Sequence, residues 1–155
     1  MKLNNQHISF VQRIQIELRS KNKHNKTSIE KLAGQYGIKD KNEVKELTEL
    51  AIVKECREIT QNNSYSNEEK FELIVDLYNH QVNLSHRTSQ SILLQQYSTP
   101  APIGYLAGLF CGVDNENIKG FEPSAGNGSF SLQIPNCIAS TGIECEQCAL
   151  PDFCR

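Results

Sequence analysis

Apolar residues recur at helical spacing from the start of the chain, and this pattern predicts helices. They stand three or four positions apart between Ile8 and Leu18, and again in "SIEKLAGQYGI", where Gly37 is placed to end the helix. Thr27 and Glu30 form a capping-box pattern in front of this second helix. Before residue 96 there is no alternation of period two, so strands are not expected there.

Two longer amphipathic segments follow. Asp40 with Glu43 predicts the start of a helix that continues to about residue 60, and Ser66 with Glu69 predicts another start. The second of these helices is expected to bury a stripe made of Phe71, Ile74, Val75, Tyr78 and Val82. The segment "VNLSHRTSQSILLQQY" continues in the helical pattern after a bend near Asn83. Residues 1–96 are therefore interpreted as a helical N-terminal module.

The pattern changes at Tyr97, where "YSTPAP" begins. Pro100 and Pro102 each push the preceding residue out of the helical region, so this segment is expected to be extended. After it, "IGYLAGLFCGV" predicts a helix with an apolar face formed by Ile103, Leu106, Ala107 and Phe110.

The remaining chain predicts strands. A short strand is expected around residues 119–122, a glycine loop follows, a helix is expected near 129–134, and "CIASTGIE" is a second apolar strand. The predicted fold class is α/β: a mostly helical module at 1–96, then the first strand-helix-strand unit of an incomplete, Rossmann-like parallel sheet at 97–155.

Charge is unevenly distributed along the 155 residues, whose formal net charge is −2. Residues 1–60 carry 12 basic and 8 acidic groups, whereas residues 61–155 carry 4 and 10. The N-terminal part is the better candidate for facing phosphates, with a solvated helix surface as the alternative. No apolar run approaches the roughly 18 residues of a membrane span, and the first residues lack the apolar centre of a signal peptide, so a cytoplasmic protein without membrane contact is expected.

The stretch "KGFEPSAGNGSFSL", residues 119–132, has the composition of a ligand-binding loop, because glycines allow a ligand to approach the backbone closely. A Walker phosphate loop would need a lysine between Gly128 and Ser129, and the dinucleotide fingerprint would need glycine or alanine where Ser131 stands. A plain turn stays open. Glu122 precedes the loop, and Glu144 follows one strand-helix-strand unit later, where an acid can accept both hydroxyls of a ribose.

These residues carry a family resemblance. "FEPSAGNG" resembles the S-adenosylmethionine loop of class I methyltransferases, in the form found in N6-adenine DNA methyltransferases. "QQYSTPAPIGYLAGLF" resembles the segment that precedes this loop, and "GIECE" is similar to the acid-bearing second strand. The resemblance covers about residues 90–146, and the helical region before it is similar to the N-terminal extension of large bacterial DNA methylases.

The resemblance implies S-adenosylmethionine as cofactor and DNA as the partner of the complete enzyme. It places Thr99 and Pro100 by the methionine end, uses Glu122 to order the loop or the methionine ammonium, and uses Glu144 to hold the ribose. The implied cofactor-binding residues are Thr99, Pro100, Glu122, Pro123, Ser124, Ala125, Gly126, Asn127, Gly128 and Glu144.

The catalytic motif of that family, Asp/Asn/Ser-Pro-Pro-Tyr/Phe, is absent from the sequence. We therefore expect the cofactor-binding N-terminal part of a DNA adenine N6-methyltransferase, inactive alone and dependent on a missing C-terminal catalytic region. Two alternatives stay open. One is a helical DNA-binding or protein-interaction module with a non-functional methyltransferase remnant, and the other is a methyltransferase for amines of protein or RNA.

Other motifs are weaker. Four thiolates could hold zinc, but only one pair has tight ligand spacing among Cys137, Cys145, Cys148 and Cys154. The outline of a helix-turn-helix in "TSIEKLAGQYGIKDKNEVKEL" is opposed by three acids near the start of its second helix, Glu43, Glu46 and Glu49. The histidines are expected to be polar surface residues: His7, His24, His80 and His86.

Overall fold

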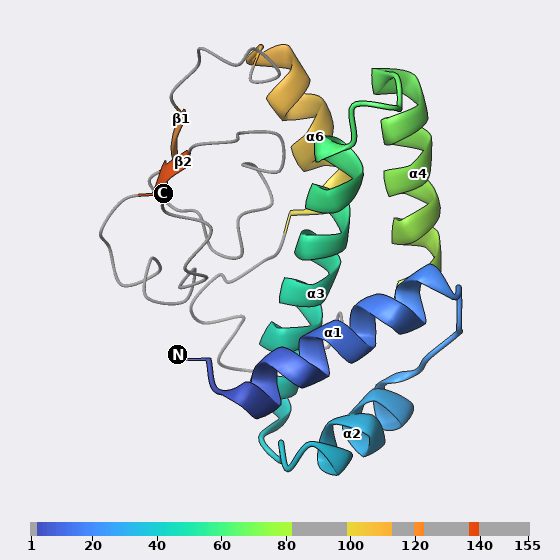
Figure 1. The fold of residues 1–155 in the computed structure, drawn as a ribbon, viewed down its shortest axis with the longest axis vertical. Coiled ribbons are helices and arrows are strands. Elements are labelled where there is room, and N and C mark those ends of the chain that lie inside the picture. The colour runs from blue at the N-terminus through green and yellow to red at the C-terminus, as the bar shows by residue number, and fades with distance from the viewer. Residues whose placement is uncertain (1–2, 82–98, 113–119, 123–136, 140–155) are drawn as a thin grey trace.

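Helices make up most of the described chain (Figure 1). The computed structural model describes residues 3–81, 99–112, 120–122 and 137–139. Its elements in chain order are the helices α1 (Asn5–Arg19), α2 (Lys26–Gln35), α3 (Lys41–Gln61), α4 (Asn67–His80) and α6 (Ala101–Phe110), then the strands β1 (Gly120–Glu122) and β2 (Cys137–Ala139). The four helices predicted before residue 81, and the one predicted after the proline pair, are confirmed.

Side-chain caps define where the helices begin. Ser66 caps α4 and exchanges hydrogen bonds with Glu69, as the sequence predicted. The predicted pair Thr27 and Glu30 is wrong, because Asn25 caps α2 two residues earlier: its side-chain oxygen accepts the N–H of Ser28 at 2.9 Å. Asparagine is a better N-cap than threonine, so the helix begins at the asparagine.

Two helix ends share one motif. Lys21 follows the last turn of α1 and Gly37 follows the last turn of α2, and both have positive φ, 53° and 77°. In each case two N–H groups return to carbonyls of the last turn, from Lys21 and Asn22 after α1 and from Gly37 and Ile38 after α2. This is the Schellman arrangement, which usually places glycine in the left-handed position. Gly37 ends α2 as predicted, whereas lysine at the equivalent position of α1 is unusual.

The core forms around α3, which packs against α1, α2 and α4, and Figure 1 shows α1 lying across it. The fully buried apolar side chains include Phe10, Ile14, Ile29, Leu47, Cys56 and Ile74. The predicted stripe of α4 is only partly right, because Ile74 is buried as predicted, Tyr78 is exposed, and Leu77, which was not predicted, is buried. Val82 lies outside the described residues.

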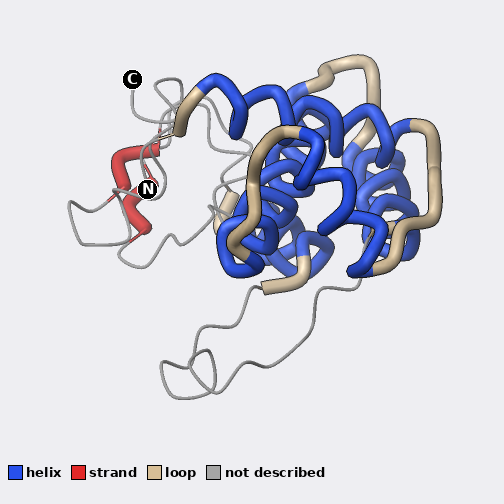
Figure 2. Tube along the Cα trace, turned by 90° about the horizontal axis from the view of Figure 1, so that it is seen from below, coloured by secondary structure: helices blue, strands red, loops and turns tan. Residues whose placement is uncertain are grey.

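The predicted α/β fold class is wrong. The described residues form a helical structure, and their only strands, β1 and β2, are three residues long each. These strands pair in parallel, with Gly120 opposite Cys137 and Glu122 opposite Ala139, and Figure 2 shows them beside the helices. A stable parallel sheet needs more and longer strands with both faces covered, and such a sheet is not formed by the described residues. The helix predicted near 129–134 and the boundary at residue 96 lie outside them.

Candidate functional site

The start of α6 carries the first two predicted cofactor residues. Thr99 and Pro100 are half-buried, and Pro100 is the N-cap residue, with its carbonyl accepting the N–H groups of Ile103 and Gly104. Pro102 lies in the first turn, where its fixed φ suits a helix and its missing N–H is tolerated. The extended backbone predicted for this segment is wrong at Ala101, which precedes Pro102 and is nevertheless the first residue of α6.

Packing against α4 fixes the position of α6. Tyr105 is 1% exposed, its ring stacks on Phe71 with centroids 6.5 Å apart, and its hydroxyl lies 3.3 Å from Oδ1 of Asn67. The buried face of α6 consists of Ala101, Gly104, Tyr105 and Gly108. The predicted apolar face is wrong in orientation, because its larger members are exposed: Ile103, Leu106 and Phe110. Both glycines of α6 are thus on the buried side, together with Tyr105.

The strand pair positions the backbone of one more predicted residue. Glu122 ends β1, directly before the glycine motif in the sequence. The other predicted cofactor residues lie outside the described residues: Pro123, Ser124, Ala125, Gly126, Asn127, Gly128 and Glu144. The described residues thus locate Thr99, Pro100 and the strand that leads into the loop, and they do not assemble the cofactor site.

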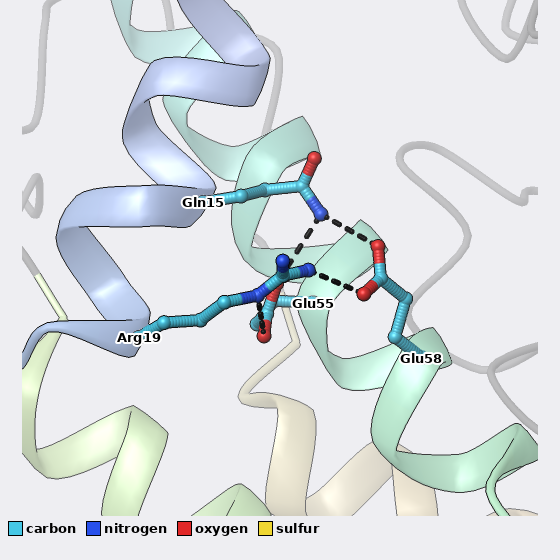
Figure 3. Close-up of polar contacts among 4 residues, drawn as sticks. All are labelled: Gln15, Arg19, Glu55 and Glu58. Carbon is cyan, nitrogen blue, oxygen red and sulfur yellow. Dashed lines mark hydrogen bonds and ion pairs between the residues drawn. The ribbon is translucent and has the colours of Figure 1, made fainter.

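A polar cluster joins α1 to α3 (Figure 3). Glu55 is 7% exposed and accepts three N–H groups: Nε and Nη2 of Arg19 at 2.8 and 2.9 Å, and Nε2 of Gln15 at 3.2 Å. Glu58 also binds Arg19, and it accepts Nε2 of Gln15 at 3.0 Å. These hydrogen bonds raise the pKa of Arg19, with Glu55 as the main cause. Because its oxygens already accept three N–H groups, Glu55 fits a structural clamp better than a general base.

A second buried acid lies at the end of α1. Glu17 accepts the side-chain amide of Asn22 at 2.6 Å, contacts Nε2 of His24 at 3.0 Å, and pairs with Arg13. The hydrogen bond from Asn22 is the main reason that the pKa of Glu17 lies below its ordinary value, with His24 next. Sequence reasoning missed both clusters. The partners of Glu55 lie on another helix, whereas Glu17 is marked locally by its i,i+4 spacing from Arg13, with Asn22 and His24 following shortly after α1.

The histidine prediction is wrong for His7, which is buried. Its Nδ1 accepts the N–H of Asn4 at 3.2 Å, and its Nε2 lies 3.1 Å from Oε1 of Glu43 at the start of α3. His24 is half-buried against Glu17. The repeated use of histidine beside helix starts and acids indicates structural roles, and His86 lies outside the described residues.

A zinc site is not supported by the described part of the chain, where no group of three or more His, Cys, Asp or Glu side chains could hold a metal. Cys56 is fully buried, and burial raises the pKa of its thiol to about 12, so it is an inert core residue. Of the four predicted ligands, Cys137 is in β2, and the other three lie outside the described residues.

Comparisons with protein-family models, with curated proteins and with solved structures found no match. Within the described residues, no helix has the length and apolar character needed to cross a membrane. The functional argument therefore depends on the chain's own residues.

Proposed function

We propose that this protein is the cofactor-binding N-terminal part of a DNA adenine N6-methyltransferase, with S-adenosylmethionine as cofactor. The observation that carries the proposal is the motif "FEPSAGNG", in the order "YSTPAP", glycine loop, "GIECE" along the chain. Its glycines would let the cofactor lie against the backbone, and Glu144 would accept the ribose hydroxyls. DNA as the substrate and a cytoplasmic location belong to the same proposal.

Two structural observations support this reading. Thr99 and Pro100 are held in place, because α6 begins at Ala101 and is anchored on α4 by Tyr105. β1 ends at Glu122, so the glycine motif follows a fixed backbone segment. Ordered segments before a ligand loop lower the ordering entropy that binding must overcome.

Methyl transfer is not assigned to this chain by itself. The proline-proline motif that would hold a flipped adenine is absent from the sequence, so the proposed activity of the 155 residues is cofactor binding. A separate catalytic region would supply the acceptor site. The alternative, a helical module with a non-functional remnant, predicts no cofactor binding at all.

Calorimetric titration of S-adenosylmethionine into the full chain tests the proposal. Gly126→Arg should abolish saturable binding, because a long side chain would occupy the space where the cofactor meets the backbone. Gly34→Arg is the matched control: Gly34 lies on α2 with nothing within 4 Å of an added Cβ, so the same substitution there should leave binding unchanged. Absence of binding to the unmodified chain would refute the proposal and favour the helical module.

A further inference from the structure

Lysines gather around α2. Residues 20–42, which comprise the connection before α2, α2 itself, the turn after it and the first two residues of α3, contain six lysines and two acids, a net charge of +4. The whole chain carries −2, so the rest of the molecule is acidic. We call the exposed lysines of this segment that pair with no described carboxylate the α2 surface: Lys23, Lys31, Lys39 and Lys41.

The lysines of the α2 surface differ from most other cations of the described chain. Arg13, Arg19, Lys21 and Lys45 each pair with a carboxylate. No ion pair joins the four lysines of the α2 surface to a described carboxylate. An unpaired exposed cation keeps its full attraction for an external anion, whereas a paired one is largely compensated.

Neither of the two acids of the segment is an exposed residue of α2, whereas Asp40, between Lys39 and Lys41, is exposed. Glu30 is half-buried and lies 4.0 Å from Lys26, and Asp40 accepts the N–H of Asn42 as the cap of α3. The outward positions of α2 are polar, basic or small, because Ile29 and Ala33 take the buried side. The exposed residues of α2 are Lys26, Thr27, Lys31, Gly34 and Gln35.

The dimensions suit a polyanion. The ten residues of α2 extend over about 15 Å, and one strand of duplex DNA presents a phosphate about every 3.4 Å along its axis. Lys31 lies on α2, Lys23 in the connection before it, Lys39 in the turn after it and Lys41 at the start of α3. These lysines therefore occur on and around a helix whose length matches the spacing of several phosphates.

Base reading by a helix-turn-helix is a poorer fit. The second helix of such a motif must enter the major groove, but α3 is the central helix of the fold and has ten buried residues. Near its start, Glu43 is engaged by His7. Contacts to the phosphate backbone need only exposed cations, and the four lysines of the α2 surface are exposed.

We propose that the α2 surface binds the phosphate backbone of double-stranded DNA without reading its sequence. The choice of DNA among polyanions rests on the proposed function. The contact itself rests on the unpaired lysines, and it does not require S-adenosylmethionine. It would hold the helical region on the duplex while a catalytic region acts on the base.

The test is fluorescence anisotropy of the full chain with a labelled duplex of about 30 base pairs, titrated without cofactor over a series of salt concentrations. The test variant is Lys31→Gln with Lys39→Gln. The matched control is Lys54→Gln with Lys70→Gln, which removes the same charge from α3 and α4, where the described residues also show no ion pair to either lysine. Circular dichroism should show the same helical content for all three proteins.

The slope of the log association constant against log salt concentration should become shallower by about 0.9 for each lost phosphate contact. The two substitutions of the test variant should therefore reduce the magnitude of this slope by about 1.8. Its affinity at about 100 mM salt should fall by at least tenfold, while the control stays within about threefold of the unmodified chain. The proposal is overturned if the chain does not bind the duplex, if both variants weaken equally, or if anionic vesicles bind and DNA does not. Titration of the same proteins with S-adenosylmethionine distinguishes the two proposals, because cofactor binding tests the proposed function and duplex binding tests the α2 surface.

Discussion

The Arg19–Glu55 pair should stabilise the packing of α1 on α3. Glu55 is 7% exposed, and its oxygens accept two N–H groups of Arg19 and one of Gln15 (Figure 3). Two unit charges about 4 Å apart attract by about 4 kcal/mol at an effective dielectric constant of about 20. Half of the Arg19 side chain is in water, with 51% exposed, so solvent screening reduces this value.

We therefore expect a coupling free energy between Arg19 and Glu55 of about 1–2 kcal/mol. This value is larger than that of exposed ion pairs and smaller than the roughly 3–5 kcal/mol lost when a fully buried pair is broken. A double-mutant cycle measures it: Arg19→Gln, Glu55→Gln and the double variant, each unfolded in urea. Gln15 should keep an acceptor in these chains, because the side-chain amide introduced by Glu55→Gln retains one oxygen.

Glu58→Gln is the matched control, because Glu58 also pairs with Arg19 but 58% of its side chain is exposed. It should lower the free energy of unfolding by less than about 0.5 kcal/mol. A coupling between Arg19 and Glu55 below about 0.3 kcal/mol, or equal losses for the two glutamates, would refute the argument that burial makes Glu55 the stronger partner.

Three further predictions concern stability. Gly37→Ala places a side chain at positive φ and should lower the free energy of unfolding, measured in urea, by about 1 kcal/mol. Lys21→Gly, at the same position of the other Schellman motif, should not lower it. Leu47→Ala, at a fully buried site, should cost about 3–5 kcal/mol in the same assay. Because the pKa of Glu17 is depressed in the folded state, its ionised carboxylate stabilises the fold above pH 4.5, and this stabilisation is lost as the pH falls. The melting temperature of Glu17→Gln should therefore fall less on acidification than that of the unmodified chain.

Helix starts could be predicted from the sequence where the cap and its partner are local. Ser66 and Glu69 are three residues apart and satisfy each other, so the pattern was sufficient. Two residues before α2 could act as its N-cap, and the one with the stronger preference, Asn25, is the cap in place of Thr27. Local patterns therefore identify a helix better than they identify its first residue.

The orientation of α6 could not be predicted from periodicity. All ten of its residues are apolar, glycine or proline, so the helix has no polar side to mark the surface. Packing on α4 sets the orientation: Tyr105 is buried against Phe71, Gly104 and Gly108 are on the same buried side, and Phe110 is 93% exposed. The polar pairs that join α1 to α3 escaped prediction for a related reason, since Arg19 and Glu55 are 36 positions apart and meet only in the fold.

The two binding experiments can be interpreted separately when the loop variant keeps the helical region folded. The apolar side chains of the described core come from residues 3–81 and from α6. We expect Gly126→Arg to leave the thermal midpoint of this helical region unchanged, and with an unchanged midpoint the loss of cofactor binding can be assigned to the loop. A fall in the midpoint of several degrees would show that the loop packs on the helices, and the loss of binding would then no longer report on the cofactor site alone.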